Sequence, residues 1–186
     1  MSKIVAFTGN SNSGKTTLIE KLAYLLSPTF AVAVCKHDPK GKAVFDTEGK
    51  DSHRFFQAHA DVAIISPTQT TIMTHTIARP PSHLPHQAHQ ATHAHQDDNS
   101  DSLEWLYRVF AHKDYILVEG LKSLALPRIC VARGIIDTSY IEFSNAFAVD
   151  QTTDTACLPP CMPILDLNNP KEVLKWIDQF GKEING

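Results

Sequence analysis

The sequence has no long apolar segment, no signal-like start and no dense block of one charge. No apolar run approaches the roughly 20 residues of a membrane-spanning helix, and the first residues lack the basic and apolar regions of a signal peptide. The 17 basic and 20 acidic side chains are dispersed and give a net charge of −3, unlike a surface that follows a nucleic-acid backbone. We therefore expect a cytoplasmic protein without membrane or nucleic-acid partners.

Cysteine is also scarce, with four residues in the chain of 186. Cys35 and Cys130 lie in apolar, strand-like runs, which is typical of buried free thiols. Cys157 and Cys161 have C-x-x-x-C spacing, which differs from the usual C-x-x-C of metal and redox pairs, and no histidine follows nearby. The pattern therefore favours free thiols, and it leaves a metal or redox role for the last pair as an alternative.

The most informative stretch lies near the start of the chain, where residues 9–16 match G-x-x-x-x-G-K-[ST] at every fixed position. The apolar run at residues 3–8 predicts a buried strand before this motif. Apolar residues at helical spacing predict a helix after it, namely Leu18, Ile19, Leu22, Leu25 and Leu26. The motif thus falls between a strand and a helix, the position in which such a loop binds phosphate.

In that position the loop has the chemistry to hold a nucleoside triphosphate. Its backbone N–H groups wrap around the phosphates, and the dipole of the following helix favours negative charge. Lys15 reaches the terminal phosphates, as a binding and a catalytic residue, and the Thr16 hydroxyl holds Mg²⁺. The residues predicted to bind nucleotide here are Gly9, Asn10, Ser11, Asn12, Ser13, Gly14, Lys15, Thr16 and Thr17.

Strand and helix patterns alternate along the chain. Besides residues 3–8, strands are predicted at residues 30–35, 61–66, 70–74, 114–120, 128–133, 146–150 and 163–167. A final helix is predicted between a cap at Asn169 and a stop at Gly181, and its apolar stripe is Val173, Leu174, Ile177 and Phe180. The sequence has no internal repeat. We therefore predict that residues 1–186 form a single three-layer α/β domain of the P-loop NTPase class, with a mostly parallel sheet flanked by helices.

Residues 75–102 interrupt this alternation. They contain six of the ten histidines, several prolines and few large apolar side chains. Such a composition buries too little surface to offset the entropy of ordering, so we predict a mobile, His-rich surface insertion. Imidazole is a common ligand of Zn²⁺ and Ni²⁺, which leaves metal capture by this segment as an alternative to a plain loop.

A second diagnostic stretch follows, where the strand predicted at residues 114–120 ends in Glu119 and Gly120. An acid at the carboxyl end of such a strand lies beside the phosphate loop and can hold Mg²⁺ directly or through water. Asp114 precedes Glu119 by five positions, about 16 Å along a strand, which places Asp114 at the opposite edge of the sheet. Glu119 is therefore the predicted second metal ligand, with Thr16, and the predicted catalytic partner of Lys15.

Further polar residues lie where they can reach the same edge of the sheet. Lys36, His37 and Asp38 follow the second predicted strand, and ligands of open α/β sheets bind at the carboxyl ends of strands. Lys50, Asp51 and Ser52 precede a short helix and are predicted to form a mobile anion-binding segment. The alternatives are a solvated strand end for the first group and a plain helix cap for the second.

Taken together, these blocks resemble the molybdopterin-guanine dinucleotide biosynthesis protein B family. The resemblance covers nearly the whole chain outside the His-rich insertion. The resembling blocks are residues 14–22, the Val-Cys-Lys-His-Asp of residues 34–38, the Gly-Lys-Asp-Ser-His-Arg of residues 49–54, the Leu-Val-Glu-Gly-Leu-Lys of residues 117–122, residues 127–129, and two closing blocks at residues 148–150 and 165–168.

The resemblance implies a cytoplasmic, dimeric GTP-binding protein with weak Mg²⁺-dependent GTPase activity. Members of that family assist the molybdenum cofactor guanylyltransferase, which joins GMP to molybdopterin, so molybdopterin is a candidate bound substrate here. Whether the chain counts as an enzyme or mainly as an adapter is left open by the resemblance.

Three departures from familiar patterns leave other functions open. No Asn-Lys-x-Asp guanine-reading motif follows a late strand, and Asp150 and Asp154 are only weak substitutes. The His-rich insertion is longer than the family needs, and Leu121 stands where phenylalanine is expected. A nickel metallochaperone GTPase and a small-molecule kinase are the alternatives, although the former usually carries the missing guanine motif and the latter an arginine-bearing lid.

Overall fold

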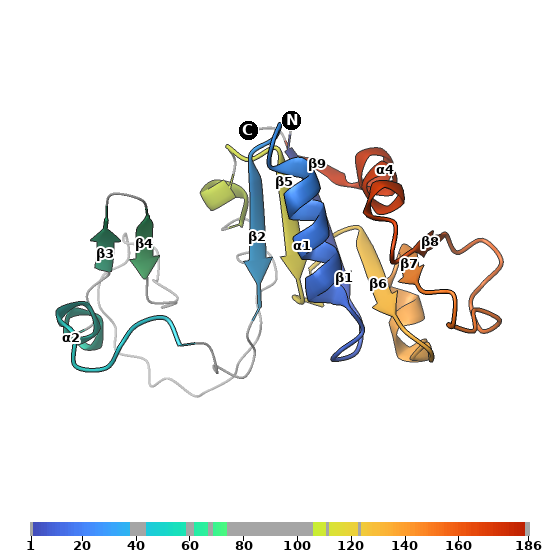
Figure 1. Cartoon of the computed structure of the whole chain (residues 1–186), viewed down its shortest axis with the longest axis horizontal. Helices are drawn as coiled ribbons and strands as arrows, with labels where there is room; N and C mark the ends of the chain where they lie inside the picture. Colours follow the sequence, from blue (N-terminus) through green and yellow to red (C-terminus); the bar gives the residue numbers. More distant parts are fainter. Residues whose placement is uncertain are drawn as a thin grey trace, which may run out of the picture. The chain divides into compact units, whose positions relative to one another are not determined.

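The computed structural model describes residues 2–37, 44–58, 62–66, 69–73, 106–110, 112–122 and 124–184. The chain forms two compact units (Figure 1), one of Met1–Pro39 with Gln96–Gly186 and the other of Lys40–His95. The His-rich insertion predicted at residues 75–102 and the predicted ligand Asp38 lie outside the described residues.

The first unit is built on a seven-stranded sheet in the order β2-β5-β1-β6-β7-β8, with β9 paired to β1. All pairs along this path are parallel, and β9 is antiparallel. The strands are β1 (Ser2–Thr8), β2 (Val32–Lys36), β5 (Tyr115–Glu119), β6 (Arg128–Ala132), β7 (Ala146–Val149), β8 (Ile164–Asp166) and β9 (Lys182–Ile184). Each strand predicted in this unit is therefore present, and β9 was not predicted.

Helices cover both faces of the sheet because alternate strand residues point to opposite sides. On one face, Val5 and Phe7 of β1 are fully buried in a cluster with side chains of α1 (Lys15–Leu26) and α4 (Pro170–Phe180). On the other face, Ile4 and Ala6 pack with Leu106, in the helical residues 106–110. The 3₁₀-helix η1 (Thr138–Phe143) joins a third apolar cluster with β6 and β7. The predicted α/β class, a mostly parallel sheet flanked by helices, is confirmed.

The exposure of several apolar residues differs from the prediction, in and before β2 because it is the first strand in the sheet order. Residues 30–35 predicted a continuously buried strand, but Phe30 precedes β2 and is 42% exposed, and Val34 within β2 is 47% exposed. Leu25 of α1 and Phe180 of α4 are also exposed, whereas Trp176, which the predicted stripe omitted, is buried. A strand at the side of a sheet has fewer neighbours to cover it, whatever its composition.

The second unit contains α2 (Asp51–Gln57), β3 (Val62–Ile65) and β4 (Thr70–Met73). Both predicted strands form, but they pair with one another as an antiparallel hairpin, in which Val62 faces Met73, rather than extending the parallel sheet. The connection explains this pairing, because Ser66 N–H donates to the Gln69 carbonyl at 2.8 Å and the Ser66 hydroxyl accepts from Gln69 N–H at 3.0 Å. So short a connection joins antiparallel strands, whereas parallel strands need a crossover of a dozen or more residues.

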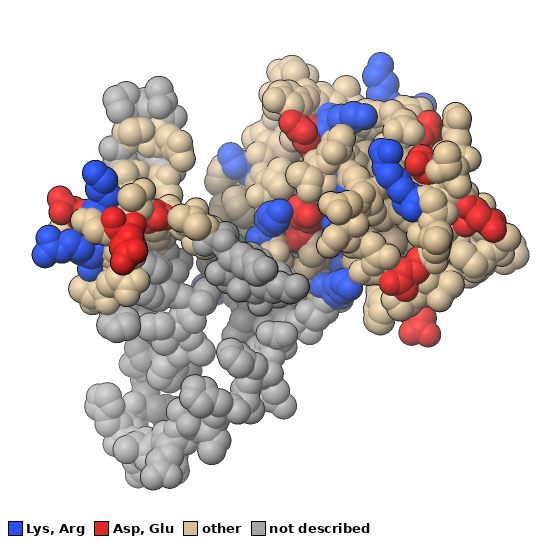
Figure 2. Space-filling view, turned by 60° about the horizontal axis from the view of Figure 1, so that its bottom comes forward, with Lys and Arg blue, Asp and Glu red and all other residues tan. Residues whose placement is uncertain are grey.

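On the face drawn in Figure 2, basic and acidic side chains are interspersed rather than segregated. None of the described helices has the length and apolar character needed to cross a membrane.

The four cysteines are free and differ in burial. Burial raises the pKa of the Cys130 thiol to about 11 and also raises the pKa of Cys35, so both stay largely protonated at pH 8. Cys157 and Cys161 are exposed. The prediction of buried thiols holds for Cys130, whereas Cys35 is only partly buried.

We predict that iodoacetamide at pH 8 alkylates Cys157 and Cys161 of the native chain at least about tenfold faster than Cys130, because only an accessible thiolate reacts. Peptide mass spectrometry over a time course measures the four rates. The denatured chain is the control, in which the four rates should converge. Native Cys130 reacting as fast as Cys157 would contradict its burial.

Candidate functional site

The predicted phosphate loop connects β1 to α1 and depends on glycine at both ends. Gly9 has φ +130°, and a Cβ there would lie 2.2 Å from the Val131 carbonyl oxygen, so no other residue fits. Gly14 has φ +99° and caps α1 without a side-chain hydrogen bond. The first N–H groups of α1 therefore lack a side-chain cap, and they face the loop that precedes the helix.

Lys15, the first residue of α1, folds back over this loop. Its Nζ donates to the carbonyl oxygens of Gly9 at 3.0 Å and Asn10 at 2.6 Å, and it lies 3.5 Å from the Ser13 hydroxyl. Desolvation by partial burial lowers the pKa of Lys15, and the nearby Glu119 carboxylate opposes that shift. The loop thus encloses the amine of Lys15, while Thr16 and Thr17 are exposed in the first turn of the helix.

Glu119 ends β5 directly beside the strand that leads into the loop. It is in register with Phe7 of β1, and the next amide, of Gly120, donates to the Phe7 carbonyl at 3.1 Å. Asp114 lies at the other end of the strand, where its carboxylate accepts from Ala31 N–H at 2.7 Å. The predicted separation of these two acids is confirmed, and Glu119 is on the loop side.

Lys36 and His37 meet Glu119 from the other neighbouring strand. Lys36 is in register with Glu119, and its Nζ lies 3.8 Å from Glu119 Oε2. His37 N–H donates to the Glu119 carbonyl at 3.0 Å, and a Cβ on Gly120 would lie 3.1 Å from the His37 Cβ. The structure therefore brings Lys15, Lys36, His37 and Glu119 to one edge of the sheet.

The predicted anion-binding segment belongs to the second unit. Lys50 precedes α2, and its carbonyl accepts from Arg54 N–H at 3.0 Å. Asp51 and Ser52 are the first two residues of α2, where an acidic side chain favours the helix dipole. Their local setting is that of a helix start.

Arg128 is a buried residue of the site to which the sequence pattern gave no role. It is the first residue of β6, is 1% exposed, and its guanidinium donates four hydrogen bonds to the segment that follows Glu119. The acceptors are the carbonyl oxygens of Gly120 at 3.1 Å, Leu121 at 3.0 Å, Lys122 at 3.2 Å and Leu124 at 3.0 Å. Burial lowers the pKa of Arg128, and the four carbonyls fix the path of the chain after Glu119.

A small cavity of about 100 Å³ lies beside the phosphate loop, between it and the end of β6. Tyr140 of η1 lines it, and its hydroxyl accepts a hydrogen bond from Lys122 Nζ at 3.0 Å. Hydrogen bonds from Ser139 hold the pKa of Asp137, another lining residue, below its usual range. Lys122 and Asp137 thus supply opposite charges next to the loop. Within the part of the chain that is described, no three His, Cys, Asp or Glu side chains gather as a metal site.

Known proteins resemble this chain in both sequence and fold. Residues 4–150 match the family model described as molybdopterin guanine dinucleotide synthesis protein B. The chain is 34% identical over 187 residues to a molybdopterin-guanine dinucleotide biosynthesis adapter protein of Haemophilus influenzae, which covers 98% of this chain and 92% of that one.

Solved structures with this fold include MobB of Bacillus subtilis, with a TM-score of 0.66, 23% identity and coverage of 97% of this chain and 99% of that one. A MobB homologue from Bacillus stearothermophilus has a TM-score of 0.57, 19% identity and 95% coverage of both chains. On the family match and the Haemophilus influenzae relative, the chain belongs to the molybdopterin guanine dinucleotide synthesis protein B family.

Proposed function

We propose that the chain is a GTP-binding adapter that assists the guanylyltransferase converting molybdopterin to its guanine dinucleotide form, with weak Mg²⁺-dependent GTPase activity. One observation carries this proposal. Lys15 folds over the β1–α1 loop, and the Glu119 carboxylate lies at the end of β5, the strand next to β1. The molybdenum cofactor role comes from the name of the Haemophilus influenzae relative.

Phosphate binding requires only a small rearrangement of the loop. Lys15 now shares its amine protons with the Gly9 and Asn10 carbonyls, and these contacts are the ones that a terminal phosphate oxygen would replace. The Lys15 ammonium is charged in both states, but a phosphate oxygen adds an attraction between opposite charges that a neutral carbonyl does not supply, so the exchange is favourable. The uncapped amides at the start of α1 would bind the remaining phosphate oxygens.

The residues at this edge also fit a magnesium ion. Glu119 offers a carboxylate that makes an ion pair of 3.8 Å with Lys36, and Thr16 offers an exposed hydroxyl in the first turn of α1. Both are hard oxygen ligands of the kind that Mg²⁺ takes together with substrate phosphates. When bound, Mg²⁺ neutralises charge that develops on the phosphates during transfer to water.

We further propose that the segment of Lys36, His37 and Asp38 binds the terminal phosphates or the phosphate of molybdopterin through the Lys36 cation, and that Lys50, Asp51 and Ser52 form an anion-binding segment of the second unit, with Lys50 as its cation. A cation beside the γ-phosphate position would attract either group. Slow hydrolysis suits an adapter, which holds the nucleotide for a second protein. We also propose that the chain acts as a homodimer in the cytoplasm.

The proposal is tested by titrating GTP and ATP into the full chain with and without Mg²⁺, and then adding the chain to a guanylyltransferase with molybdopterin. We expect Mg²⁺-dependent GTP binding, slow phosphate release and stimulated guanylylation, without transferase activity of the chain alone. Equal guanylylation rates with and without the chain would refute the adapter role. Analytical ultracentrifugation measures the oligomeric state.

We predict that Glu119→Gln lowers Mg²⁺-dependent GTP hydrolysis by at least about tenfold and weakens GTP affinity by only a few fold, because the amide keeps the shape but loses the charge that holds Mg²⁺. Phosphate release at saturating GTP gives the first quantity, and isothermal titration calorimetry gives the second. Glu20→Gln, an exposed change on α1, is the matched control and should behave as wild type. Unchanged turnover in Glu119→Gln would contradict the metal role.

A further inference from the structure

The strand order sets the direction in which a bound nucleotide must run. Glu119 ends β5, on one side of the central strand β1, whereas β6, β7 and β8 follow in order on the other side. If the terminal phosphate lies near Lys15 and Glu119, as proposed above, the phosphate chain enters the loop from the side away from β5. The nucleoside then lies over the carboxyl ends of β6, β7 and β8, where ligands of open α/β sheets bind.

Two of these strand ends come close to the last glycine of the loop. A Cβ on Gly14 would lie 3.3 Å from the Nε of Arg133, which follows β6, and 3.6 Å from a methyl of Leu167, which follows β8. The missing side chain of Gly14 therefore leaves the Arg133 guanidinium next to the first turn of α1. Because Arg133 is half exposed, its planar group is available to a ligand.

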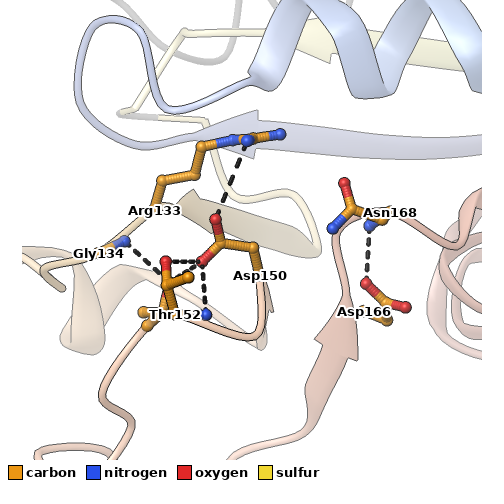
Figure 3. A network of polar contacts seen from close by, with 7 residues as sticks. Arg133, Gly134, Asp150, Thr152, Asp166 and Asn168 are labelled. Atoms are coloured by element: carbon orange, nitrogen blue, oxygen red, sulfur yellow. Dashed lines mark hydrogen bonds and ion pairs between the residues drawn. The ribbon is translucent and has the colours of Figure 1, made fainter.

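Asp150, at the end of β7, forms an ion pair with Arg133 and, among the described residues, is hydrogen-bonded through Oδ1 alone (Figure 3). Its Oδ1 accepts from the Thr152 hydroxyl at 2.9 Å and the Thr153 hydroxyl at 2.6 Å, and its Oδ2 lies 3.9 Å from Arg133. These hydroxyl bonds lower the pKa of Asp150, which stays ionised. Asp150 is thus a positioning residue, which disfavours it as the reader of a base.

The side chains of Asp166 and Asn168, at the end of β8, make fewer hydrogen bonds than that of Asp150 (Figure 3). Asp166 Oδ1 accepts from the backbone N–H of Asn168 at 2.8 Å. Neither Asp166 Oδ2 nor the side-chain amide of Asn168 makes a hydrogen bond to any other residue that the structure describes. Asp166 is half-buried and Asn168 is exposed. The turn therefore carries a carboxylate oxygen on Asp166 and, two residues later, a side-chain amide on Asn168, both without a hydrogen bond among the described residues.

The geometry points to a guanine-selective nucleoside site formed by Arg133, Asp166 and Asn168. Guanine presents adjacent N–H donors on N1 and N2, which a carboxylate oxygen of Asp166 accepts, and an O6 acceptor, to which the Asn168 amide donates. Adenine lacks those two donors and presents an amino group where guanine has O6, so it matches neither side chain. The Arg133 guanidinium packs against the base or the α-phosphate. The site deepens the proposed function and rests on it.

The test uses Asp166→Asn in the full chain, with GTP, xanthosine triphosphate, ATP and inorganic tripolyphosphate as titrants in the presence of Mg²⁺. Asparagine keeps an Oδ1 atom that accepts from the backbone N–H of Asn168, so the turn is retained. It replaces the acceptor of the guanine amino group by a donor, which suits the oxygen that xanthine carries there. We expect GTP affinity to fall about 10- to 100-fold, xanthosine triphosphate affinity to rise and tripolyphosphate affinity to stay unchanged.

A matched control is available in the loop after β7. Asp154 accepts from Ala156 N–H at 2.9 Å, the same two-residue turn that Asp166 makes. Asp154→Asn should leave every affinity as in wild type. Asn168→Ala is the second variant and should weaken GTP but not tripolyphosphate.

The titrants separate the two proposals. An unchanged ratio of GTP to xanthosine triphosphate in Asp166→Asn, with wild-type tripolyphosphate binding, overturns the guanine site and leaves the phosphate loop standing. A selectivity change in Asp154→Asn instead of Asp166→Asn also overturns it. Wild-type protein that binds neither GTP nor tripolyphosphate overturns the loop assignment together with this site.

Discussion

Replacing Lys15 with alanine is expected to lower the affinity of the chain for Mg²⁺-GTP by at least about 100-fold. Lys15 reaches back over the loop, and its amine bonds to the Gly9 and Asn10 carbonyls place its charge where the terminal phosphates would bind. Removing it loses charge-assisted hydrogen bonds worth about 1.5–3 kcal/mol each. Isothermal titration calorimetry with GTP and with tripolyphosphate measures the loss, which should be similar for both because the phosphates carry it.

Lys21→Ala is the matched control, because Lys21 is exposed on the same helix. It should bind GTP as wild type does. The Lys15 variant should still unfold cooperatively, because the lost amine of Lys15 bonds only two partly solvated carbonyls and Lys15 is the first residue of α1. GTP affinity within a few fold of wild type in Lys15→Ala would sink the assignment of residues 9–16 as a phosphate loop.

The sequence predicted the loop well because the relevant constraints are local. Residues 9–16 carry their own turn chemistry, and the flanking periodicities place them between β1 and α1. Glu119 was found for a similar reason, since an apolar run that ends in an acid and a glycine marks the end of a buried strand. In both cases a few neighbouring residues contain the whole signal.

The sheet order was not accessible in this way, whereas the hairpin had a sequence signal, the short connection at residues 67–69, that the prediction did not use. Nothing in residues 30–35 says that the strand lies at one side of the sheet, where Val34 is exposed. The strands near residues 61–66 and 70–74 were found, but their antiparallel pairing depends on the short connection through Ser66 and Gln69. Pairing is decided by which strands meet in three dimensions, and composition is nearly silent about that.

Arg128 and Arg133 show the same limit within the site. Each lies at an end of an apolar strand run, where a charge usually marks a solvated boundary. Arg128 is nevertheless buried, with its guanidinium bonded to four backbone carbonyls between Gly120 and Leu124, and Arg133 lies beside Gly14, more than a hundred residues away in the chain. The one available signal was that residues 127–129 belong to the family pattern, and a resemblance identifies such residues without explaining their contacts.

Replacing Arg128 with methionine is expected to destabilise the chain by about 2–6 kcal/mol, because it removes four hydrogen bonds donated by a buried cation and leaves buried carbonyls unsatisfied at about 1–3 kcal/mol each. Methionine fills much of the volume but leaves the Gly120 and Lys122 carbonyls without a donor, whereas the Leu121 and Leu124 carbonyls still accept from the Leu124 and Leu126 N–H groups. For a domain of this size the loss corresponds to a fall in melting temperature of roughly 10 °C, measurable by calorimetry or circular dichroism. Lysine has a single donor head in place of the planar fork, so Arg128→Lys should recover only part of the stability.

The same variants separate a structural role of Arg128 from its effect on the site. Arg54→Met, an exposed change on α2, is the control and should alter stability by less than about 0.5 kcal/mol. At a temperature where Arg128→Lys is fully folded, GTP hydrolysis should still fall, because the backbone that follows Glu119 is no longer fixed and the carboxylate loses its position relative to Lys15 and Lys36. Tripolyphosphate affinity should change little, since the loop and Lys15 are intact. Wild-type stability of Arg128→Met would mean that water satisfies those carbonyls, and wild-type hydrolysis in folded Arg128→Lys would mean that Glu119 is positioned by the strand alone.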